Sequence, residues 1–182
     1  MNLWKDIKNQ PPHAPKVVYA VIETPKGSWN KYVYETSKET FCLGQVSPLC
    51  YPADYGIIPQ ALGDNGNPLN MLVLTHQPTF SGCLIKTKPI GIIKMRDDEG
   101  KDEKIIGVPV NDPSSEDIQD IKDLPKSLLE EITHFFREYA KNQNINTEIV
   151  GWENRKEAVR IIERSMDCYN DMLSIKSLFL LD

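Results

Sequence analysis

The chain has 182 residues with a formal net charge of −5 and a pI of about 5.3, which predicts one domain with a substantial core rather than two. The acidic balance and the lack of a basic stripe argue against nucleic-acid binding. No run approaches the roughly 20 apolar residues that a membrane span needs. The first five residues lack the apolar segment of a signal peptide, so we expect a cytoplasmic protein.

Short strand-like segments dominate the first two thirds of the chain. They follow an irregular, proline-rich N-terminal arm over residues 1–16. Runs of β-branched and alternating residues predict strands over 17–23, 31–35, 41–46, 71–75, 83–86, 90–95 and 104–108. Clusters of Gly, Pro, Asn and Asp separate these runs. So many short strands are typical of a barrel or a sandwich.

Helical spacing begins after Pro113. An apolar stripe predicts a helix over 124–141, with Pro125 in its first turn, and a second helix is expected over 154–173. Strands first and helices last indicate an α+β fold with a single core over residues 1–182. Residues 174–182 are expected to form an apolar C-terminal tail that packs on the body or on another subunit.

The four cysteines form no C-x-x-C pair, and their spacing argues against a zinc site. Each is expected to pack as a small hydrophobe.

The loop from residue 63 to residue 70 has the spacing of a metal site but not its charges. Asn65, Asn67 and Asn70 stand where a D-x-D-x-x-D cluster would have carboxylates. Asn is nearly isosteric with Asp, but it is uncharged and cannot accept a proton near neutral pH. Asp64 could supply one carboxylate if the loop register moved by a residue. Alternatively, Asn65-Gly66 is a type I′ hairpin turn.

Two further segments could carry chemistry. Residues 94–104 place five acids within seven positions, which predicts either a solvated hairpin or a loop that binds Mg²⁺ or Ca²⁺. The string Tyr51-Pro52-Ala53-Asp54-Tyr55-Gly56 has two tyrosines four positions apart. They are either core aromatics with a polar tip or hydroxyl donors to an anion.

Several motifs occur in order along the chain: residues 27–32 (GSWNKY), 51–56 (YPADYG), 67–70 (NPLN), 78–83 (PTFSGC), 94–104, 134–136 (HFF) and 151–153 (GWE). Together they resemble the family I soluble inorganic pyrophosphatases, from about residue 3 to about residue 165. The resemblance implies a small closed five-stranded OB-type β-barrel with flanking strands and C-terminal helices, assembled as a homo-oligomer, commonly a hexamer. It also implies hydrolysis of diphosphate to two phosphates with Mg²⁺, or Mn²⁺, as the metal.

The resemblance assigns roles to residues that match the family pattern. Carried over position by position, these are the metal ligands Glu23, Asp97 and Asp102, the substrate-binding residues Lys31, Lys104, Tyr139 and Tyr51, and Tyr55, which matches a tyrosine near the nucleophile.

Other positions depart from the pattern. Asn65 and Asn70 replace metal-binding aspartates, and Asn67 replaces the aspartate that acts as base. Three further positions are apolar where the family has charged residues: Val33 replaces a glutamate, Leu43 replaces an arginine and Ala140 replaces a lysine. Gln45 could partly replace the arginine if its loop shifted. Lys141 follows Ala140 directly, so on a helix it would point about 100° away.

These departures predict that diphosphate hydrolysis is strongly weakened or lost and that metal affinity is reduced. Removing a general base alone typically costs a factor of roughly 10²–10⁴ in rate. Two alternatives stay open. The chain could be a non-catalytic protein that binds phosphate, diphosphate or a nucleotide, or it could be an oligomer partner of an active paralogue. In each case the expected ligand is a small anion.

Overall fold

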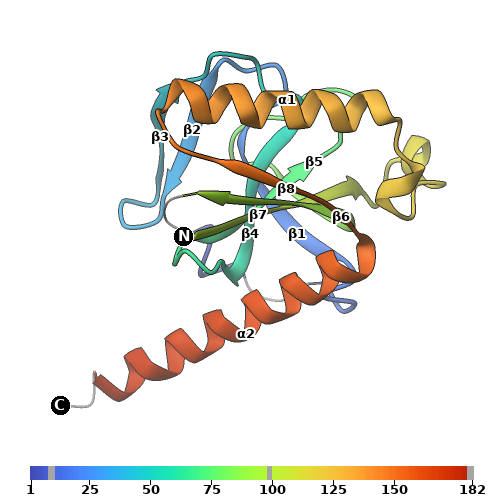
Figure 1. Cartoon of the computed structure of the whole chain (residues 1–182). Helices are drawn as coiled ribbons and strands as arrows, with labels where there is room; N and C mark the ends of the chain where they lie inside the picture. The colour runs from blue at the N-terminus through green and yellow to red at the C-terminus, as the bar shows by residue number, and fades with distance from the viewer. Residues whose placement is uncertain (8–10, 98–99, 180–182) are drawn as a thin grey trace.

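The computed structural model describes residues 1–7, 11–97 and 100–179 (Figure 1). The described residues form β1 (Val18–Thr24), β2 (Asn30–Glu35), β3 (Thr40–Val46), β4 (Asp54–Leu62), β5 (Pro68–Val73), β6 (Leu84–Asp97), β7 (Gly100–Pro109), α1 (Lys126–Asn142), β8 (Glu148–Asn154) and α2 (Arg155–Phe179). Two short 3-10 helices, Pro113–Ser115 and Ile121–Asp123, lie between β7 and α1.

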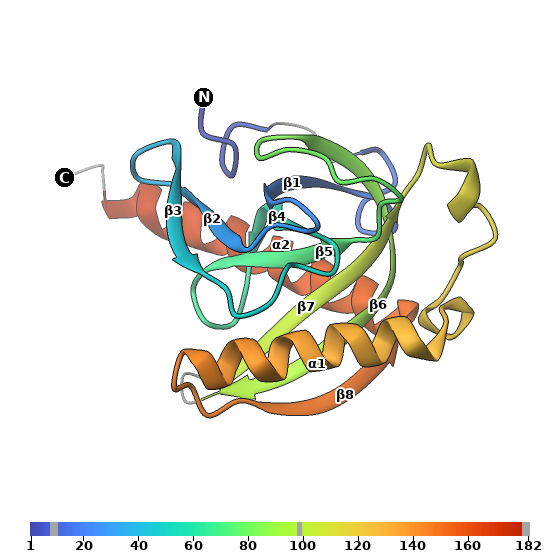
Figure 2. The same ribbon diagram turned by 90° about the horizontal axis from the view of Figure 1, so that it is seen from above.

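Five strands close into a ring. The main sheet has the order β1-β4-β5-β7-β6-β8, and an additional pairing of β1 with β6 joins the two ends of its first five strands. This ring confirms the expected five-stranded barrel. The β5–β7 pair is parallel, whereas β6 and β7 form a long antiparallel hairpin. The β2–β3 hairpin forms a separate two-stranded sheet beside the ring (Figure 2).

The two helices cover different parts of the barrel (Figures 1 and 2). Side chains alternate between the faces of a strand. Ile93 accordingly packs in one core cluster with Ile132 of α1, and Ile92 packs in another with Ile161 of α2. Both faces of β6 are therefore buried in this region. Neither described helix has the length and apolar character that crossing a bilayer requires.

Several element boundaries differ from the sequence prediction. β6 is one strand where two were expected, because the chain continues through Pro89 and Gly91 by way of a register shift. β4 and β8 were not predicted. α1 begins at Lys126, with Pro125 as its N-cap rather than in its first turn.

The C-terminal end of the chain also differs from the prediction, whereas the described residues of the N-terminal arm are irregular as expected. α2 continues to Phe179, so residues 174–179 extend a helix rather than form a separate tail; residues 180–182 lie outside the described part of the chain. The N-terminal arm is anchored by Trp4, which is buried and packs edge-on against Tyr169 of α2 with ring centroids 5.1 Å apart.

The four cysteines are free thiols. Cys42 and Cys83 are half-buried, but Cys50 and Cys168 are exposed. The expectation that every cysteine packs as a small hydrophobe is therefore wrong for the last two.

Candidate functional site

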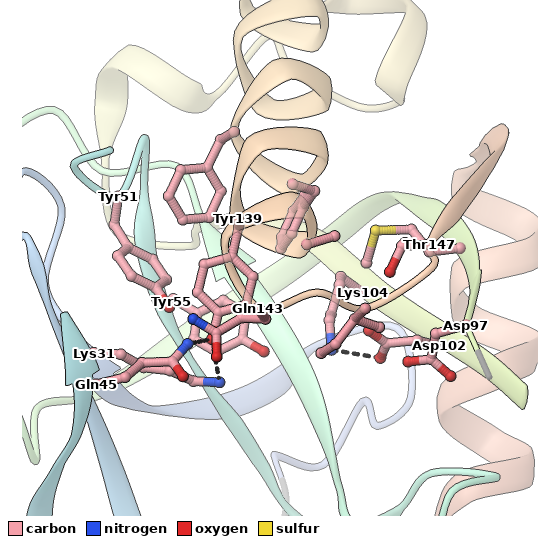
Figure 3. Close-up of a pocket in the computed structure, with 15 residues that line it drawn as sticks. Lys31, Gln45, Tyr51, Tyr55, Asp97, Asp102, Lys104, Tyr139, Gln143 and Thr147 are labelled. Atoms are coloured by element: carbon pink, nitrogen blue, oxygen red, sulfur yellow. Dashed lines mark hydrogen bonds and ion pairs between the residues drawn. The ribbon is translucent and has the colours of Figure 1, made fainter. Parts of the chain in front are cut away.

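Two adjoining cavities lie between the barrel, the β2–β3 hairpin and α1. The first cavity, of about 250 Å³, opens beneath α1 (Figure 3). The second cavity, of about 370 Å³, extends toward the loop between β4 and β5. Both are lined by Lys31, Tyr55, Asp97, Asp102 and Lys104. These shared residues make the two cavities one continuous site.

The structure brings every matched position, and every altered position except Leu43, to these cavities. Tyr51 and Tyr139 line the first, Glu23, Asn65, Asn67 and Asn70 line the second, and the five shared residues complete the set. Val33 lines the second cavity and Ala140 the first. These two apolar replacements thus face the site as well.

Polar side chains from three elements meet at Tyr139 of α1. Lys31 Nζ of β2 donates a hydrogen bond to the Tyr139 hydroxyl at 2.9 Å and lies over its ring, 5.2 Å from the centroid. Gln45 of β3 donates to the same hydroxyl through Nε2. Figure 3 shows Lys31 and Gln45 together on one side of the cavity, facing Lys104 and the aspartates on the other. An ammonium, an amide and a hydroxyl therefore point into one space.

The β2–β3 register explains why Gln45, and not Leu43, faces the site. Lys31 is paired with Gln45 and Tyr32 with Leu43, with a register shift between the two pairs. Residues paired directly across an antiparallel ladder share a face, so Gln45 lies beside Lys31. Leu43 is 58% exposed. The register shift within the hairpin thus places Gln45 at the site.

Lys104 links the two aspartate-type positions on the opposite side. Its Nζ donates to Asn70 Oδ1 at 2.9 Å and to Asp102 Oδ1 at 2.5 Å. Parallel pairing places Asn70 of β5 directly beside Lys104 of β7. The Asn70 amide is engaged at both ends, because its Nδ2 donates to the Gly56 carbonyl at 3.4 Å.

The loop that carries Asn65 and Asn67 is a tight turn held by its own hydrogen bonds. Gly63 N donates to Asn67 O at 2.7 Å and Gly66 N donates to Gly63 O at 3.0 Å. Among its described residues only Gly66 has a positive φ, of 78°. A type I′ turn needs positive φ at both central residues, so that prediction is wrong.

Asp64 does not replace the missing carboxylates. Its Oδ2 accepts a hydrogen bond from Arg164 Nη2 of α2 at 2.7 Å. The side chain is therefore directed to the helix rather than to the carboxylate position that a shift in register would have given it.

The acids at the site differ in environment. Glu23 is 4% exposed and accepts a hydrogen bond from Tyr34 N at 2.8 Å; burial raises the pKa of its carboxyl to about 7. Asp97 and Asp102 come from the β6–β7 hairpin, where Asp97 Oδ1 accepts from Gly100 N at 3.1 Å. The acidic segment is thus a hairpin with two carboxylates turned to the cavities; residues 98 and 99 lie outside the described residues.

The two tyrosines of the YPADYG string are core aromatics that also line the site. Tyr51 packs 4.7 Å from the Phe135 ring and 5.5 Å from the Tyr55 ring. Burial raises the pKa of both hydroxyls above the usual value. The hydroxyls therefore remain protonated and can act as hydrogen-bond donors.

Sequence reasoning missed part of the first cavity. Gln143 and Thr147, from the segment between α1 and β8, also line it. Neither lies in a periodic run or a motif, so nothing in the sequence marked them. Lys141, in contrast, turns away as expected: it is exposed and pairs with Glu138 at 2.6 Å.

The donor set does not fit a site for several divalent cations. Mg²⁺ requires about six oxygens, with carboxylates to balance its charge. Within the described residues no three acidic, His or Cys side chains converge as a metal site. Asn70 Oδ1 and Asp102 Oδ1 already accept hydrogen bonds from the Lys104 ammonium. Asp97 and Asp102 are the carboxylates shared by both cavities, and Glu23 and Glu35 line the second cavity without converging with them on one point.

Comparison with known proteins agrees with this geometry. The inorganic pyrophosphatase family model matches residues 20–170. An inorganic pyrophosphatase of Haloferax volcanii is 42% identical over 175 residues, which cover 94% of this chain and 98% of the relative. An inorganic pyrophosphatase of Geobacillus stearothermophilus is 44% identical over 158 residues, which cover 86% of this chain and 96% of the relative. The crystal structure of the Thermus thermophilus enzyme superimposes with a TM-score of 0.88 at 36% identity, covering 93% of this chain and 99% of that one. The chain belongs to the family I inorganic pyrophosphatases.

Proposed function

We propose that this chain binds diphosphate in the two adjoining cavities and that its hydrolysis of diphosphate to two phosphates is strongly weakened or lost. The observation that carries the proposal is that three amides, Asn65, Asn67 and Asn70, line a cavity that keeps Lys31 and Lys104. Family membership supports diphosphate as the ligand, since the relatives are named inorganic pyrophosphatases.

The retained side chains support anion binding. Lys31 and Lys104 face the shared space from opposite sides (Figure 3), and Tyr139 and Gln45 add a hydroxyl and an amide. Hydrogen bonds from an ammonium to phosphoryl oxygens are charge-assisted and are about twice as strong as neutral ones. A ligand with negative charge at both ends would contact both lysines.

The altered side chains support weak or absent hydrolysis. The Asn67 amide cannot accept a proton from an attacking water near neutral pH. Each replaced carboxylate also removes a unit charge, and at 4 Å a pair of unit charges is worth about 4 kcal/mol at an effective dielectric of 20. We therefore expect Mg²⁺ and Mn²⁺ to bind weakly. The effects on rate need not add, because such residues act as a unit.

A low-activity hydrolase that relies on Glu23, Asp97 and Asp102 is the second form of this proposal, favoured by the survival of those carboxylates beside the cavities. Assembly as a homohexamer, partnership with an active paralogue and a cytoplasmic location remain predictions.

The proposal is tested by two measurements on the unaltered protein. Phosphate release from diphosphate is followed with Mg²⁺ and with Mn²⁺, and diphosphate binding is measured by calorimetric titration. We expect measurable binding and a turnover far below the usual range of roughly 1–10³ s⁻¹. Turnover within that range would contradict the proposed loss of hydrolysis. An absence of binding would contradict the proposal that diphosphate is the ligand.

A further inference from the structure

The Lys104 ammonium lies between two oxygen donors of the site. It is 2.9 Å from Asn70 Oδ1 and 2.5 Å from Asp102 Oδ1, and its side chain is only 9% exposed. Its Nζ also lies 5.9 Å from the centroid of the Tyr55 ring. A fixed positive charge is therefore held where an amide oxygen and a carboxylate oxygen converge.

From this arrangement we propose that the first cavity binds its phosphoryl anion free of divalent metal, with Lys104 supplying positive charge that metal ions supply in phosphoryl-transfer sites generally. The inference rests on the proposed function and specifies its ligand: an uncomplexed phosphate or diphosphate rather than the magnesium complex.

The first reason is competition for the same oxygens. Mg²⁺ binds oxygen ligands at about 2.0–2.1 Å. An ion that took Asn70 Oδ1 and Asp102 Oδ1 would lie against the Lys104 ammonium, which is bonded to both. Repulsion between two close cations is strong where water is scarce. A carboxylate at position 70 would offset that repulsion with a full charge, whereas the amide offers only a dipole.

The second reason is the charge balance of the cavity walls. The charged side chains that line the first cavity are Lys31, Lys104, Asp97 and Asp102, and their formal charges cancel. A metal-free diphosphate there meets two ammonium groups without an excess of carboxylates. The adjoining cavity is already lined by Glu23 and Glu35. Three aspartates at the amide positions would add three more negative charges there, and the anion would then need bound cations.

The hydroxyl and amide groups at the other wall complete a metal-independent donor set. Lys31 and Gln45 both donate to the Tyr139 hydroxyl, and both line the first cavity. An entering phosphoryl oxygen can take these hydrogen bonds in place of the tyrosine oxygen. The proposed anion would thus contact Lys104 at one end and Lys31 with Gln45 at the other.

Calorimetric titration with diphosphate, and separately with inorganic phosphate, tests the inference. Each is run in EDTA and again with excess Mg²⁺. We expect at least one of the two anions to bind in EDTA, with equal or lower affinity when Mg²⁺ is present, because Mg²⁺ complexes the free ligand. Which anion binds more tightly identifies the ligand.

A matched pair of variants tests the role of Lys104. Lys104→Gln is expected to weaken binding in EDTA by about 10- to 100-fold, the loss of one charge-assisted hydrogen bond. Lys86→Gln makes the same charge change on the exposed side of β6 and should leave binding unchanged. If Lys104→Gln does not fold, Lys31→Gln provides the test from the opposite wall.

The outcomes separate the inference from the proposed function. Binding that requires Mg²⁺ overturns the metal-free inference and leaves the proposed function standing. Absence of anion binding in both conditions overturns the proposed function itself. Metal-free binding that is unaffected by Lys104→Gln and by Lys31→Gln overturns the placement of the anion between these two lysines.

Discussion

Arg164 Nη2 lies 2.7 Å from Asp64 Oδ2, and this ion pair joins α2 to the loop between β4 and β5. The same guanidinium lies 3.5 Å from Glu103 Oε2 of β7. Because Asp64 directly precedes Asn65, the pair fixes the entry to the turn that carries Asn65 and Asn67. α2 thus helps to position Asn65 and Asn67, which line the second cavity.

Replacing Arg164 with Ala should loosen that turn without unfolding the protein. The two side chains are 34% and 36% exposed, and such pairs contribute about 0–1 kcal/mol to stability. We expect amide hydrogen exchange over residues 63–67 to accelerate, with little change in melting temperature. Arg160→Ala is the control, because Arg160 pairs with Glu157 on the same helix. Equal exchange in both variants would contradict the positioning role.

Restoring Asp at positions 65, 67 and 70 together should raise Mg²⁺ affinity and diphosphate hydrolysis. The three carboxylates would return charge and a proton acceptor to the second cavity. We expect phosphate release to rise by about 10² or more, the smaller end of a general-base contribution. The measurement is steady-state phosphate release, with Asp at position 64 retained. A triple variant as slow as the parent would show that Val33, Leu43 and Ala140 also limit the reaction.

Gln45 is expected to contribute to anion binding, whereas Leu43 is not. Gln45 lines the first cavity, and Leu43 is 58% exposed. Loss of one hydrogen bond to a charged acceptor corresponds to about 1.5–3 kcal/mol, or roughly a 10- to 160-fold weaker Kd. Calorimetric titration of Gln45→Ala and Leu43→Ala compares the two. An effect of Leu43→Ala that equals that of Gln45→Ala would contradict the register of the β2–β3 hairpin.

The sequence predicted the strands that are uninterrupted β-branched or alternating runs. The collinear motifs, through the family resemblance, predicted the barrel. The strand prediction failed at β4 and β8 for a local reason. β4 contains Gly56 and Pro59, and β8 contains Gly151, residues that mark turns when they are read without partners. In the fold, Gly56 lies against the backbone of β1, where an added Cβ would be 2.0 Å from Val21 O. The packing of β4 against β1 therefore requires glycine at position 56, the same residue that made β4 look like a turn in the sequence.

The positions of the candidate site lie in sequence motifs, whereas the contacts that support them do not. Nothing in sequence spacing indicates that Arg164 would meet Asp64 across 100 positions. The face on which Gln45 lies depends on a single bulge between Lys31 and Tyr32. Such contacts follow from the packing of distant elements, which a linear pattern does not encode.

The buried carboxyl of Glu23 should make the stability of the protein fall as the pH rises from about 4.5 to about 7. Burial raises its folded-state pKa from 4.5 to about 7. In that window the unfolded chain has released the proton and the folded chain keeps it, so raising the pH favours unfolding. The loss amounts to at most about 3 kcal/mol. The Glu23→Gln substitution removes the titratable carboxyl. The side-chain oxygen of the glutamine can still accept the hydrogen bond from Tyr34 N.

Urea unfolding in EDTA at pH 5, 6, 7 and 8 measures this effect. The stability of Glu23→Gln relative to the parent should increase from pH 5 to pH 7 and then level off toward pH 8, where Glu23 is ionised in both the folded and the unfolded chain. Glu131→Gln, an exposed position on α1, serves as the control and should track the parent. A constant difference between Glu23→Gln and the parent at all four pH values would mean that Glu23 is already ionised at pH 5. Its buried carboxylate would then have to be stabilised by the Tyr34 hydrogen bond and by Lys31 and Lys104, the groups that lower its pKa.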